Sequence, residues 1–444
     1  MKHPFYSLLM WLAQPLLRRK LARRAVAEPG YAEAVEERFG HYRCPADSGR
    51  VWIHAVSLGE TRAAAILLAE LRQQMPGLRL LLTHGTATGR AEGAKLLQDG
   101  DIQVWQPWDT PDAVQRFLAH FRPAVGVLME TEVWPNLTDA CARQGIALAL
   151  ANARMNPRSH ARARRLLWLA RPVFGALAAV WAQTEGDAAR LRDLGAKVTG
   201  VFGNLKFDAS PQPVLLEKAQ AWRTGIDRPV VLLASSREGE EKPFLKLIST
   251  HSSVKRSGVA SDTGVIAGNP EAQYLIVPRH PQRFDEVAAL IAEAGLRVSR
   301  RRDWGDGSPP PATGDSVWLG DSLGEMALYY GLADVALLGG SFEPLGGQNL
   351  IEAAACGCPV VMGPHTFNFA EAAALAQSGG AARETPDMTT ALTAALGLLA
   401  NPEELAAARQ AAIAFSQAHR GAASRTARAV ISLMEAGDPQ LAAD

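Results

Sequence analysis

The chain has 444 residues, of which 48% are hydrophobic, and this length favours two well-packed globular domains over one small core. Its 46 lysines and arginines almost balance its 45 aspartates and glutamates. A nucleic-acid-binding function usually brings a basic excess and is therefore disfavoured. The four cysteines, Cys44, Cys141, Cys356 and Cys358, include no C-x-x-C pair. Neither a zinc site nor a disulfide framework is indicated, which fits a reducing compartment.

The N-terminal residues form an apolar run over 5–17, interrupted by Ser7, Gln14 and Pro15. A basic cluster follows it at once, made of Arg18, Arg19, Lys20, Arg23 and Arg24. The run is shorter than the roughly 20 apolar residues that span a bilayer. Its main charges follow it, whereas those of a signal peptide precede the apolar run. We predict that residues 1–40 form an uncleaved membrane anchor with a basic flank on the cytoplasmic side, either partly inserted or lying in the interface. A buried N-terminal helix is the alternative.

From residue 51 onward, short apolar strands alternate with amphipathic helical segments. In the first half of the chain the sequence predicts strands over residues 51–55, 78–83, 125–129, 146–151, 180–183 and 198–201. This alternation is typical of a parallel sheet covered by helices. A cluster of Ser210, Pro211 and Pro213 then indicates a linker.

A second set of predicted strands covers residues 230–234, 274–277, 317–319, 335–338 and 359–362. Two polar, glycine-containing stretches, 250–269 and 301–314, interrupt this set and are predicted to be surface insertions. The pattern predicts an α/β fold of two doubly wound domains, 41–208 and 215–425, followed by a C-terminal tail over 426–444. Because ligands bind at the carboxyl ends of the strands in such sheets, we expect a site in a cleft between facing domains.

The segment 335–363 is the most informative stretch of the chain, and it reads V-A-L-L-G-G-S-F-E-P-L-G-G-Q-N-L-I-E-A-A-A-C-G-C-P-V-V-M-G. It predicts a βαβ unit whose first loop can hold a phosphate, because Gly346 and Gly347 allow the backbone to approach an anion at a helix start. Asn349 lies near this helix start. Glu352, one turn later, can accept hydrogen bonds from ribose hydroxyls. The pattern therefore indicates a nucleotide or nucleotide-sugar site.

In the first domain, the segment H-A-V-S-L-G-E over 54–60 ends a strand and opens a helix. Glu60 lies three residues after Ser57, which is the spacing of a capping box, so helix capping is one interpretation of Glu60. The other interpretation is a general base. A helix N-terminus lowers the basicity of a carboxylate, so a base at this position requires burial to raise its pKa again.

Two further segments of the first domain carry charged groups. In M-E-T-E-V-W-P-N over 129–136, Glu130 and Glu132 follow a predicted strand and share a face in strand-like alternation. We expect at least one of them to serve the site, by positioning a substrate hydroxyl or Glu60. In G-N-L-K-F-D over 203–208, Lys206 is placed to meet a carboxylate or phosphate as a point charge, and a solvated linker lysine is the alternative.

Three strand-end loops of the second domain are also polar: 235–241 (S-S-R-E-G-E-E), 278–284 (P-R-H-P-Q-R-F) and 321–326 (D-S-L-G-E-M). The serines and backbone of the first loop can contact phosphate. Arg279 and His280 in the second are candidates for contacts with a nucleotide phosphate and base. The backbone of the third can read a base edge. Polar loops after successive strands are hard to explain by the fold alone.

Together these segments resemble a known family. The chain contains, in the order found in the 3-deoxy-D-manno-octulosonic acid (Kdo) transferases of lipopolysaccharide synthesis, the strings H-A-V-S-L-G-E, M-E-T-E-V-W-P-N-L, G-N-L-K-F-D, P-R-H-P-x-R-F, G-D-S-L-G-E-M, G-G-S-F-x-x-x-G-G-Q-N-L-I-E and M-G-P-H-T-F-N-F. The resemblance reaches roughly residue 420. It implies a GT-B fold and an inverting mechanism that needs neither metal nor cofactor. It also implies CMP-Kdo as donor and an acceptor of the lipid A precursor (lipid IVA) type, at the cytoplasmic leaflet of a Gram-negative inner membrane.

The resemblance also implies roles for single residues. Glu60 is similar in position to the catalytic base of the family, and Glu130 and Lys206 to groups proposed to stabilise the transition state. The positions that contact CMP in the family correspond here to Arg279, His280, Leu323, Gly324, Glu325, Asn349, Leu350, Ile351 and Glu352. Gln348 and Leu350 stand where many relatives have His and Pro, which affects only the expected base and ribose geometry.

Two rival functions fit the same two-domain frame. A sugar-nucleotide epimerase, or another glycosyltransferase, would share the fold, but an epimerase needs neither a lipid acceptor nor an anchor. A non-catalytic, membrane-bound nucleotide sensor would bind CMP but would have no use for the acids of the first domain. No residue of the sequence decides how many Kdo units are transferred.

Overall fold

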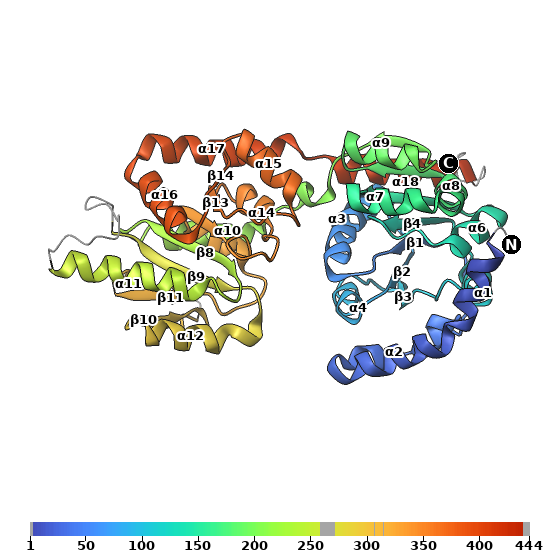
Figure 1. Cartoon of the computed structure of the whole chain (residues 1–444), viewed down its shortest axis with the longest axis horizontal. Helices are drawn as coiled ribbons and strands as arrows, with labels where there is room; N and C mark the ends of the chain where they lie inside the picture. Colours follow the sequence, from blue (N-terminus) through green and yellow to red (C-terminus); the bar gives the residue numbers. More distant parts are fainter. Residues whose placement is uncertain (1–2, 258–270, 306, 314, 438–444) are drawn as a thin grey trace. The chain divides into compact units, whose positions relative to one another are not determined.

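The structure is a computed structural model that describes residues 3–257, 271–305, 307–313 and 315–437, the side chains of 251–257 excepted. The chain divides into two compact units (Figure 1). The first unit comprises residues 3–208 together with 419–437, and the second comprises residues 209–418. Each unit is built around one parallel sheet.

The sheet of the first unit has the strand order β3-β2-β1-β4-β5-β6-β7, and every pairing is parallel. Its strands are β1 (Val51–His54), β2 (Leu80–His84), β3 (Ile102–Trp105), β4 (Val125–Met129), β5 (Ala147–Ala153), β6 (Ala179–Ala182) and β7 (Val198–Val201). The order reverses between β1 and β4, which are neighbours in the sheet but not in the chain. Ligands of doubly wound sheets bind at such a reversal point, outside the carboxyl ends of the strands.

Helices cover both faces of this sheet. They are α3 (Leu58–Gln74), α4 (Ala87–Ala94), α5 (Pro111–Phe121), α6 (Pro135–Arg143), α7 (Pro157–Arg165), α8 (Leu167–Gly175), α9 (Glu185–Asp193) and α18 (Ala422–Gly437), with the short helices η1 (Pro29–Ala32), η2 (Val35–Phe39) and η3 (Leu205–Asp208). One apolar core joins the sheet to α3 and α18, and a second joins it to α5, α6, α8 and α9. The sheet is therefore buried on both faces, as the near-continuous apolar strands predict.

The sheet of the second unit has the order β10-β11-β9-β8-β12-β13-β14, again with parallel pairings only. Its strands are β8 (Val230–Ser236), β9 (Gln273–Pro278), β10 (Arg297–Arg300), β11 (Ser316–Leu319), β12 (Val335–Leu338), β13 (Val360–Met362) and β14 (Ala382–Glu384). Its order reverses between β8 and β12, so the corresponding ligand position lies at the carboxyl ends of these two strands.

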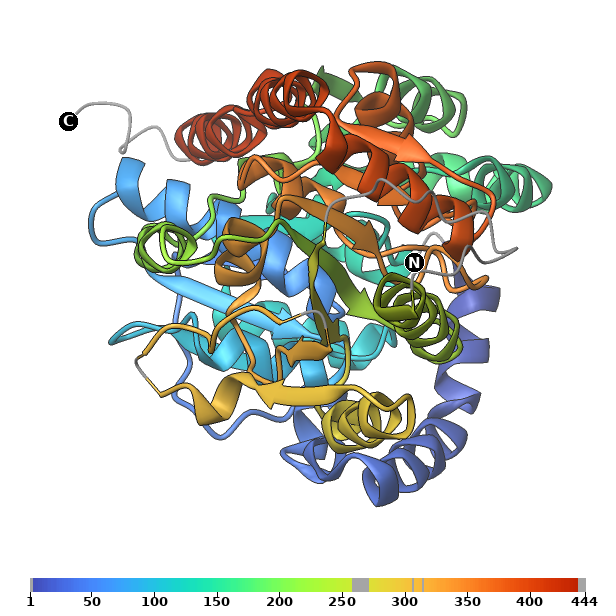
Figure 2. The same cartoon turned by 90° about the vertical axis from the view of Figure 1, so that its left-hand side faces the viewer.

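The helices of the second unit again lie on both sides of the sheet. They are α10 (Pro213–Arg223), α11 (Glu241–Ser257), α12 (Phe284–Glu293), α13 (Met326–Leu332), α14 (Leu350–Ala355), α15 (Ala370–Ser378), α16 (Met388–Ala400) and α17 (Pro402–Ala418), with η4 (Pro281–Arg283) and η5 (Arg301–Asp303). The core on one face joins the sheet to α11, α12 and α16, and Figure 2 shows α11 and α12 beside the strands.

Three strands were not predicted from the sequence: β3, β10 and β14. All three lie at an edge of their sheet. β10 and β14 contain charged side chains, and β3 contains Gln103. An edge strand has a neighbour on one side only and need not be a continuous apolar run, so the pattern that reveals buried strands misses it.

The N-terminus folds as two helices, α1 (Pro4–Leu12) and α2 (Gln14–Ala27). Pro15 lies in the first turn of α2, so the apolar run is divided after Leu12 and its second part continues into the basic cluster. Within the described ranges, no helix combines the length and apolar character needed to cross a bilayer. The predicted inserted anchor is therefore not supported.

Helix α1 is nonetheless not buried. It exposes the apolar side chains Phe5, Leu8, Leu9, Trp11 and Leu12. Ser7 fixes the inner side of the helix, because its hydroxyl donates a hydrogen bond of 2.7 Å to Oδ1 of Asn136 at the start of α6. The alternative of a buried N-terminal helix does not describe this arrangement.

The C-terminal part of the chain differs from the predicted domain bounds. The sequence assigns residues 419–425 to the second domain and residues 426–444 to a tail. In the structure, α18 packs on the first unit, where Ala427 and Val430 enter the core under α3. The Asp208 carboxylate accepts the backbone N–H groups of Gly421 and Ala423 and so holds the start of α18 at the end of η3. Gly421 marks a break before α18, but a glycine between two alanine-rich helices gave no sign that α18 returns to the first unit.

Candidate active site

Two of the predicted acids lie at the reversal point of the first sheet. Glu60 follows β1 in the first turn of α3, and Glu130 follows β4 directly. Since β1 and β4 are adjacent parallel strands, their carboxyl ends share one edge of the sheet. The fold thus places both groups where doubly wound domains bind their ligands.

Glu60 makes the contacts of a helix cap. Its Oε2 accepts the Val56 N–H at 2.8 Å, and its Oε1 accepts the Ser57 hydroxyl at 3.1 Å. Ser57 in turn accepts the Glu60 N–H as the N-cap of α3. In a capping box the carboxylate would bond the N–H of the cap residue itself, whereas here it reaches the N–H of the residue before.

The environment of Glu60 also suits a base. Burial, followed by the charges of Glu130 and Glu132, raises the pKa of Glu60 to about 7 from its ordinary 4.5, against the opposing effect of the Val56 N–H and the Ser57 hydroxyl. Burial within the first unit therefore supplies the rise in pKa that the sequence interpretation requires. The Glu60 side chain can therefore both cap α3 and act as a base.

Glu130 and Glu132 do not alternate along a strand. Both follow the end of β4 in a turn, and Glu130 has a left-handed backbone with φ of 59°. The expectation of a shared strand face is wrong in its geometry, because the strand ends at Met129. Both carboxylates are nevertheless close enough for their charges to raise the pKa of Glu60. Burial also raises the pKa of Glu132.

Lys206 faces Glu130. It lies in η3, and its Nζ is 3.9 Å from Oε1 of Glu130, with both side chains half-buried. Lys206 is therefore not a solvated linker residue. The pair places a cation beside the acids at the carboxyl edge of the sheet, where it can meet an anionic group of a substrate.

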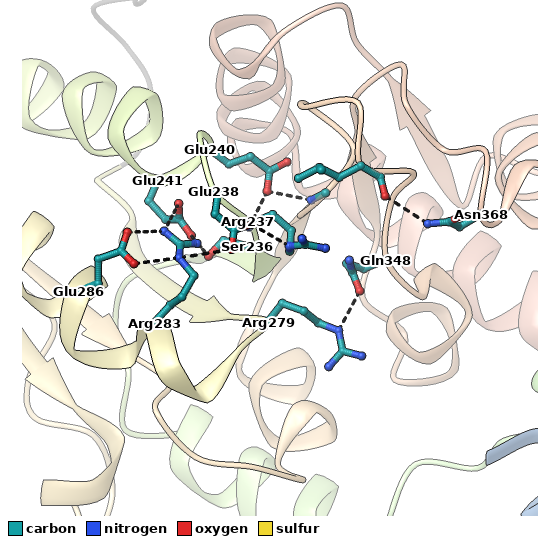
Figure 3. A network of polar contacts seen from close by, with 12 residues as sticks. Ser236, Arg237, Glu238, Glu240, Glu241, Arg279, Arg283, Glu286, Gln348 and Asn368 are labelled. Atoms are coloured by element: carbon teal, nitrogen blue, oxygen red, sulfur yellow. Dashed lines mark hydrogen bonds and ion pairs between the residues drawn. The ribbon is translucent and has the colours of Figure 1, made fainter. Parts of the chain in front are cut away.

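In the second unit, Arg279 and His280 follow β9 and lie among other cations. The Arg279 N–H donates to the Ser236 carbonyl at 3.0 Å, and its Nε donates to Oε1 of Gln348 at 3.1 Å. Burial, and then the charges of Arg237 and Arg279, lower the pKa of His280. The loops after β8 and β9 thus bring Arg237, Arg279 and His280 together at the reversal point of the second sheet, and the loop after β12 joins them through Gln348 (Figure 3). We call these three residues the cationic region; Arg237 also pairs with Glu238 at 3.1 Å.

The double glycine after β12 has a structural reason in addition to the predicted approach to an anion. Gly346 and Gly347 have positive φ, and a Cβ on Gly346 would lie 2.3 Å from Nδ2 of Asn368 and 2.6 Å from the ring of Phe367. The glycines therefore allow the loop after β13 to pack closely on the loop after β12. Gly340, at φ of 70°, is the glycine that lies beside Arg237 and Gln348.

A buried polar network holds these loops in place (Figure 3). The Glu240 carboxylate accepts the N–H groups of Arg237, Gly340 and Phe342 at 2.8–3.1 Å. Arg283, 9% exposed at its side chain, forms an ion pair of 2.7 Å with Glu241, which is 1% exposed. The network ties the loop that carries Arg279 to the loops after β8 and β12.

Leu323, Gly324 and Glu325 follow β11, whose neighbour in the sheet is β9. Gly324 has φ of 82°, and Leu323 is 73% exposed. Glu325 pairs with Arg301 at 2.9 Å and accepts the Ser322 hydroxyl. Arg301 belongs to the stretch predicted as a surface insertion, yet it is 8% exposed, so part of that stretch supports the site. The other predicted insertion falls partly on residues 258–269, outside the described residues.

The residues from Asn349 to Glu352 open α14. Asn349 is its N-cap, with Oδ1 accepting the Ile351 N–H at 3.1 Å. Leu350 and Ile351 are buried in the core, so only their backbone is available to a ligand. Glu352 is half-buried. The structure brings the predicted CMP residues to the carboxyl ends of β9, β11 and β12, and Glu60, Glu130 and Lys206 to the corresponding edge of the first sheet.

Comparison with known proteins agrees with the resemblance drawn from the sequence strings. Residues 33–209 match the family described as 3-deoxy-D-manno-octulosonic-acid transferase (kdotransferase). The chain is 46% identical over 433 residues to the 3-deoxy-D-manno-octulosonic acid transferase of Bordetella pertussis, covering 95% of this chain and 97% of the relative. This chain belongs to the Kdo transferase family. It is therefore a glycosyltransferase.

Solved structures show that the fold of this Kdo transferase is shared more widely. A glycosyltransferase from Rickettsia africae is similar with a TM-score of 0.53 and 14% identity, over 88% of this chain and 98% of that one. A UDP-GlcNAc 2-epimerase from Neisseria meningitidis gives a TM-score of 0.53 and 15% identity, over 87% and 99%. At these identities the likeness concerns the fold alone, which is that of the GT-B glycosyltransferases.

Two groups that the sequence does not predict lie among the predicted site residues of this Kdo transferase. Asn152, 2% exposed, lies within β5 where the register on β6 shifts between Leu150 and Ala153, and it has φ of 51°. Its Oδ1 accepts the Leu205 N–H at 3.1 Å, so it fixes the segment that carries Lys206. Its Nδ2 is buried and has no hydrogen-bond partner among the described residues.

Arg237 is the second missed group. It lies in the S-S-R-E-G-E-E segment, of which only the serines and the backbone were considered. Its position beside Gly340 and its effect on the pKa of His280 place it in the cationic region. For Asn152, the signal in the sequence is the A-N-A-R-M-N segment at the end of a predicted strand. For Arg237, the signal is a cation at a strand end.

A cavity of about 500 Å³ lies elsewhere in the second unit of the Kdo transferase. Its walls come from β13, β14, α16 and α17, and Arg383, Glu404 and Gln377 are among its lining residues. None of the predicted site residues lines it. Its position by the β14 edge of the sheet, away from the reversal point between β8 and β12, gives it no part in the site described above.

Proposed function

We propose that this chain transfers Kdo from CMP-Kdo to a lipid A precursor of the lipid IVA type, with inversion at the anomeric carbon and with Glu60 as the general base. The observation that carries the proposal is the environment of Glu60. A partly buried carboxylate with a pKa of about 7, at the carboxyl edge of a doubly wound sheet, is matched to proton transfer near neutral pH. The family of the chain supports the identity of the transferred sugar.

The proposed step is a single displacement. An acceptor hydroxyl attacks the anomeric carbon of Kdo, the bond from that carbon to the phosphate oxygen of CMP breaks, and CMP leaves with the electron pair of that bond. Glu60 takes the proton of the attacking hydroxyl. General base catalysis of this kind contributes typically 10²–10⁴-fold to a rate. Lys206, paired with Glu130, is proposed to meet the Kdo carboxylate or the departing phosphate and so to stabilise the transition state.

The second unit is proposed to hold the CMP part of the donor. Negative charge grows on the phosphate as CMP leaves, and preorganised cations stabilise such charge without reorganisation. Arg279, with His280 beside it, is the proposed phosphate contact. Backbone groups of Leu323, Gly324 and Glu325 are proposed to read the base, and Asn349 to Glu352 the ribose. With these charges in place, the proposed reaction uses no metal and no cofactor.

The proposed cellular place is the cytoplasmic side of the inner membrane. The exposed apolar side of α1, followed by the basic cluster in α2, has the composition of a helix that lies in a membrane interface. Its basic residues would be attracted to anionic lipid head groups. Such a location gives access to a lipid acceptor, and the proposal includes no nucleic-acid partner.

The deciding experiment incubates the full chain with CMP-Kdo and a lipid A precursor in detergent, and it follows CMP release together with product mass. A product heavier by one or more Kdo residues supports the proposal. E60Q should still bind CMP, since CMP is held by the other unit, but its transfer rate should fall by about 10²-fold or more. Near-normal turnover by E60Q would refute the base. CMP binding without transfer by wild type would favour a nucleotide sensor.

A further inference from the structure

A second surface of the first unit has the chemistry of a membrane contact. It is formed by α7 together with Leu166 and Trp168 at the start of α8, and we refer to it as the α7–α8 surface. Helix α7 has no buried residue. Trp168 is 65% exposed and Leu166 is 49% exposed. Large apolar side chains at such exposure, next to a charged helix, indicate a contact that the isolated chain does not make.

The charged side chains of this surface are basic. Residues 157–175 contain Arg158, Arg162, Arg164, Arg165 and Arg171 and no acidic residue. Asp193 of α9 reaches this helix, where it pairs with His160 at 2.7 Å and with Arg164 at 3.5 Å. No acid of the described residues pairs with Arg158, Arg162 or Arg165, all of which are exposed. The surface therefore presents a concentrated positive charge.

The distribution of charged residues over the rest of the chain makes this concentration of positive charge more significant. Residues 1–27 carry six lysines and arginines and no acid, so residues 1–27 and 157–175 hold 11 of the 46 basic residues together. The remainder then has 35 basic against 45 acidic residues. The positive charge of the chain is thus gathered in two segments, and both also expose apolar side chains. Basic residues beside an exposed Trp are typical of surfaces that lie at a lipid head-group layer.

The two segments are connected through α6. Ser7 of α1 bonds Asn136 at the start of α6, and α6 packs against α8. Figure 1 shows α6 and α8 near the end of the first unit at which α1 begins. We propose that the α7–α8 surface docks on an anionic lipid bilayer, with its arginines on the phosphate groups and Trp168 and Leu166 in the head-group region. The surface would extend the membrane contact proposed above for α1.

The experiment measures partition of the full chain into phosphatidylglycerol-containing vesicles by co-sedimentation, at lipid concentrations where about half of the wild type is bound. R162Q/R165Q should lower the partition coefficient roughly 25-fold, since each basic residue near an anionic surface contributes about 5-fold. The matched control R297Q/R383Q removes the same charge from exposed positions of the second unit and should leave partition unchanged. W168S should weaken binding to both phosphatidylglycerol and pure phosphatidylcholine vesicles, because it removes apolar contact and not charge.

Equal partition of R162Q/R165Q and R297Q/R383Q would overturn the proposal. So would light scattering that finds wild type self-associated without lipid and W168S monomeric, because the surface would then be an interface between copies of this chain. Denaturant unfolding checks that each variant is folded, through the transition of the first unit for R162Q/R165Q and W168S and that of the second unit for R297Q/R383Q. Transfer activity is not used, so failure of the proposed reaction in E60Q and failure of vesicle binding here are separate results.

Discussion

Replacing Glu60 with Gln should make the first unit more stable at alkaline pH while it removes the proposed base. In wild type the pKa of Glu60 is raised from 4.5 to about 7, first by burial and then by the charges of Glu130 and Glu132. Between these two pH values the folded chain holds a proton that the unfolded chain has released. Wild-type stability therefore falls as the pH rises through this window and stays reduced above it. Gln does not titrate, and its oxygen can still accept the Val56 N–H.

The magnitude follows from the size of the pKa rise. Because one pKa unit corresponds to 1.36 kcal/mol, the rise from 4.5 to about 7 corresponds to at most about 3 kcal/mol, and partial exposure of the side chain reduces it. If Glu60 only capped α3, Gln would keep the cap, because Glu and Gln serve alike in this position, and E60Q would change stability little at any pH above 5. The two interpretations thus differ in whether E60Q gains stability at alkaline pH.

The assay is denaturant unfolding of wild type and E60Q at about pH 5 and about pH 8.5. CMP identifies the transitions, because a ligand stabilises the unit that binds it, so the first unit is the one whose midpoint CMP does not shift. The stability of E60Q relative to wild type should increase between the two pH values by up to about 3 kcal/mol. In parallel, wild-type kcat/KM should rise about tenfold per pH unit below pH 7. A stability difference that does not change with pH would refute the raised pKa of Glu60.

Three further predictions concern the supports of the site. N152A should destabilise the first unit by about 1–3 kcal/mol in denaturant unfolding, because the buried Leu205 N–H loses its acceptor. It should also lower kcat more than it raises KM. Unchanged kcat in a folded variant would contradict the role of Asn152 in positioning Lys206. R279Q should weaken CMP binding in calorimetry by about 10-fold or more, whereas R297Q should not; equal affinities would remove Arg279 from the phosphate site. R283L should destabilise the second unit by about 3–5 kcal/mol in the same unfolding assay, because it leaves Glu241 buried and unpaired. The double variant R283L/E241L should recover most of this loss, and no recovery would refute the pairing.

The sequence predicts the central strands and the site loops because both leave local signals. Strands buried on both faces, such as β4 and β12, read as continuous apolar runs. A loop that must end a strand, open a helix and hold charge needs a special composition, as in the segment from His54 to Glu60. The charged edge strands β10 and β14 leave no such signal, since half of each strand's surroundings is solvent.

The parts that could not be predicted depend on contacts distant in sequence. The pKa of Glu60 depends first on burial, and then on Glu130 and Glu132, about 70 residues later in the chain. The closeness of Gly346 to Asn368 depends on how the loops after β12 and β13 meet. Asn152 is one polar residue after a predicted strand, and its role emerges only when Leu205 is seen to donate to it. In each case the spacing along the chain carries no information on the partner.

The return of α18 to the first unit makes the second unit an insertion within the first. Residues 209–418 are made between Asp208 and the helix that Asp208 holds. During synthesis, the part of the β1–β7 sheet that α18 covers must therefore stay exposed while the whole second unit emerges from the ribosome. A nascent chain stopped near residue 418 would have a finished nucleotide-binding unit and an unfinished partner, so truncation at the C-terminus should damage the half of the protein that comes first in the sequence.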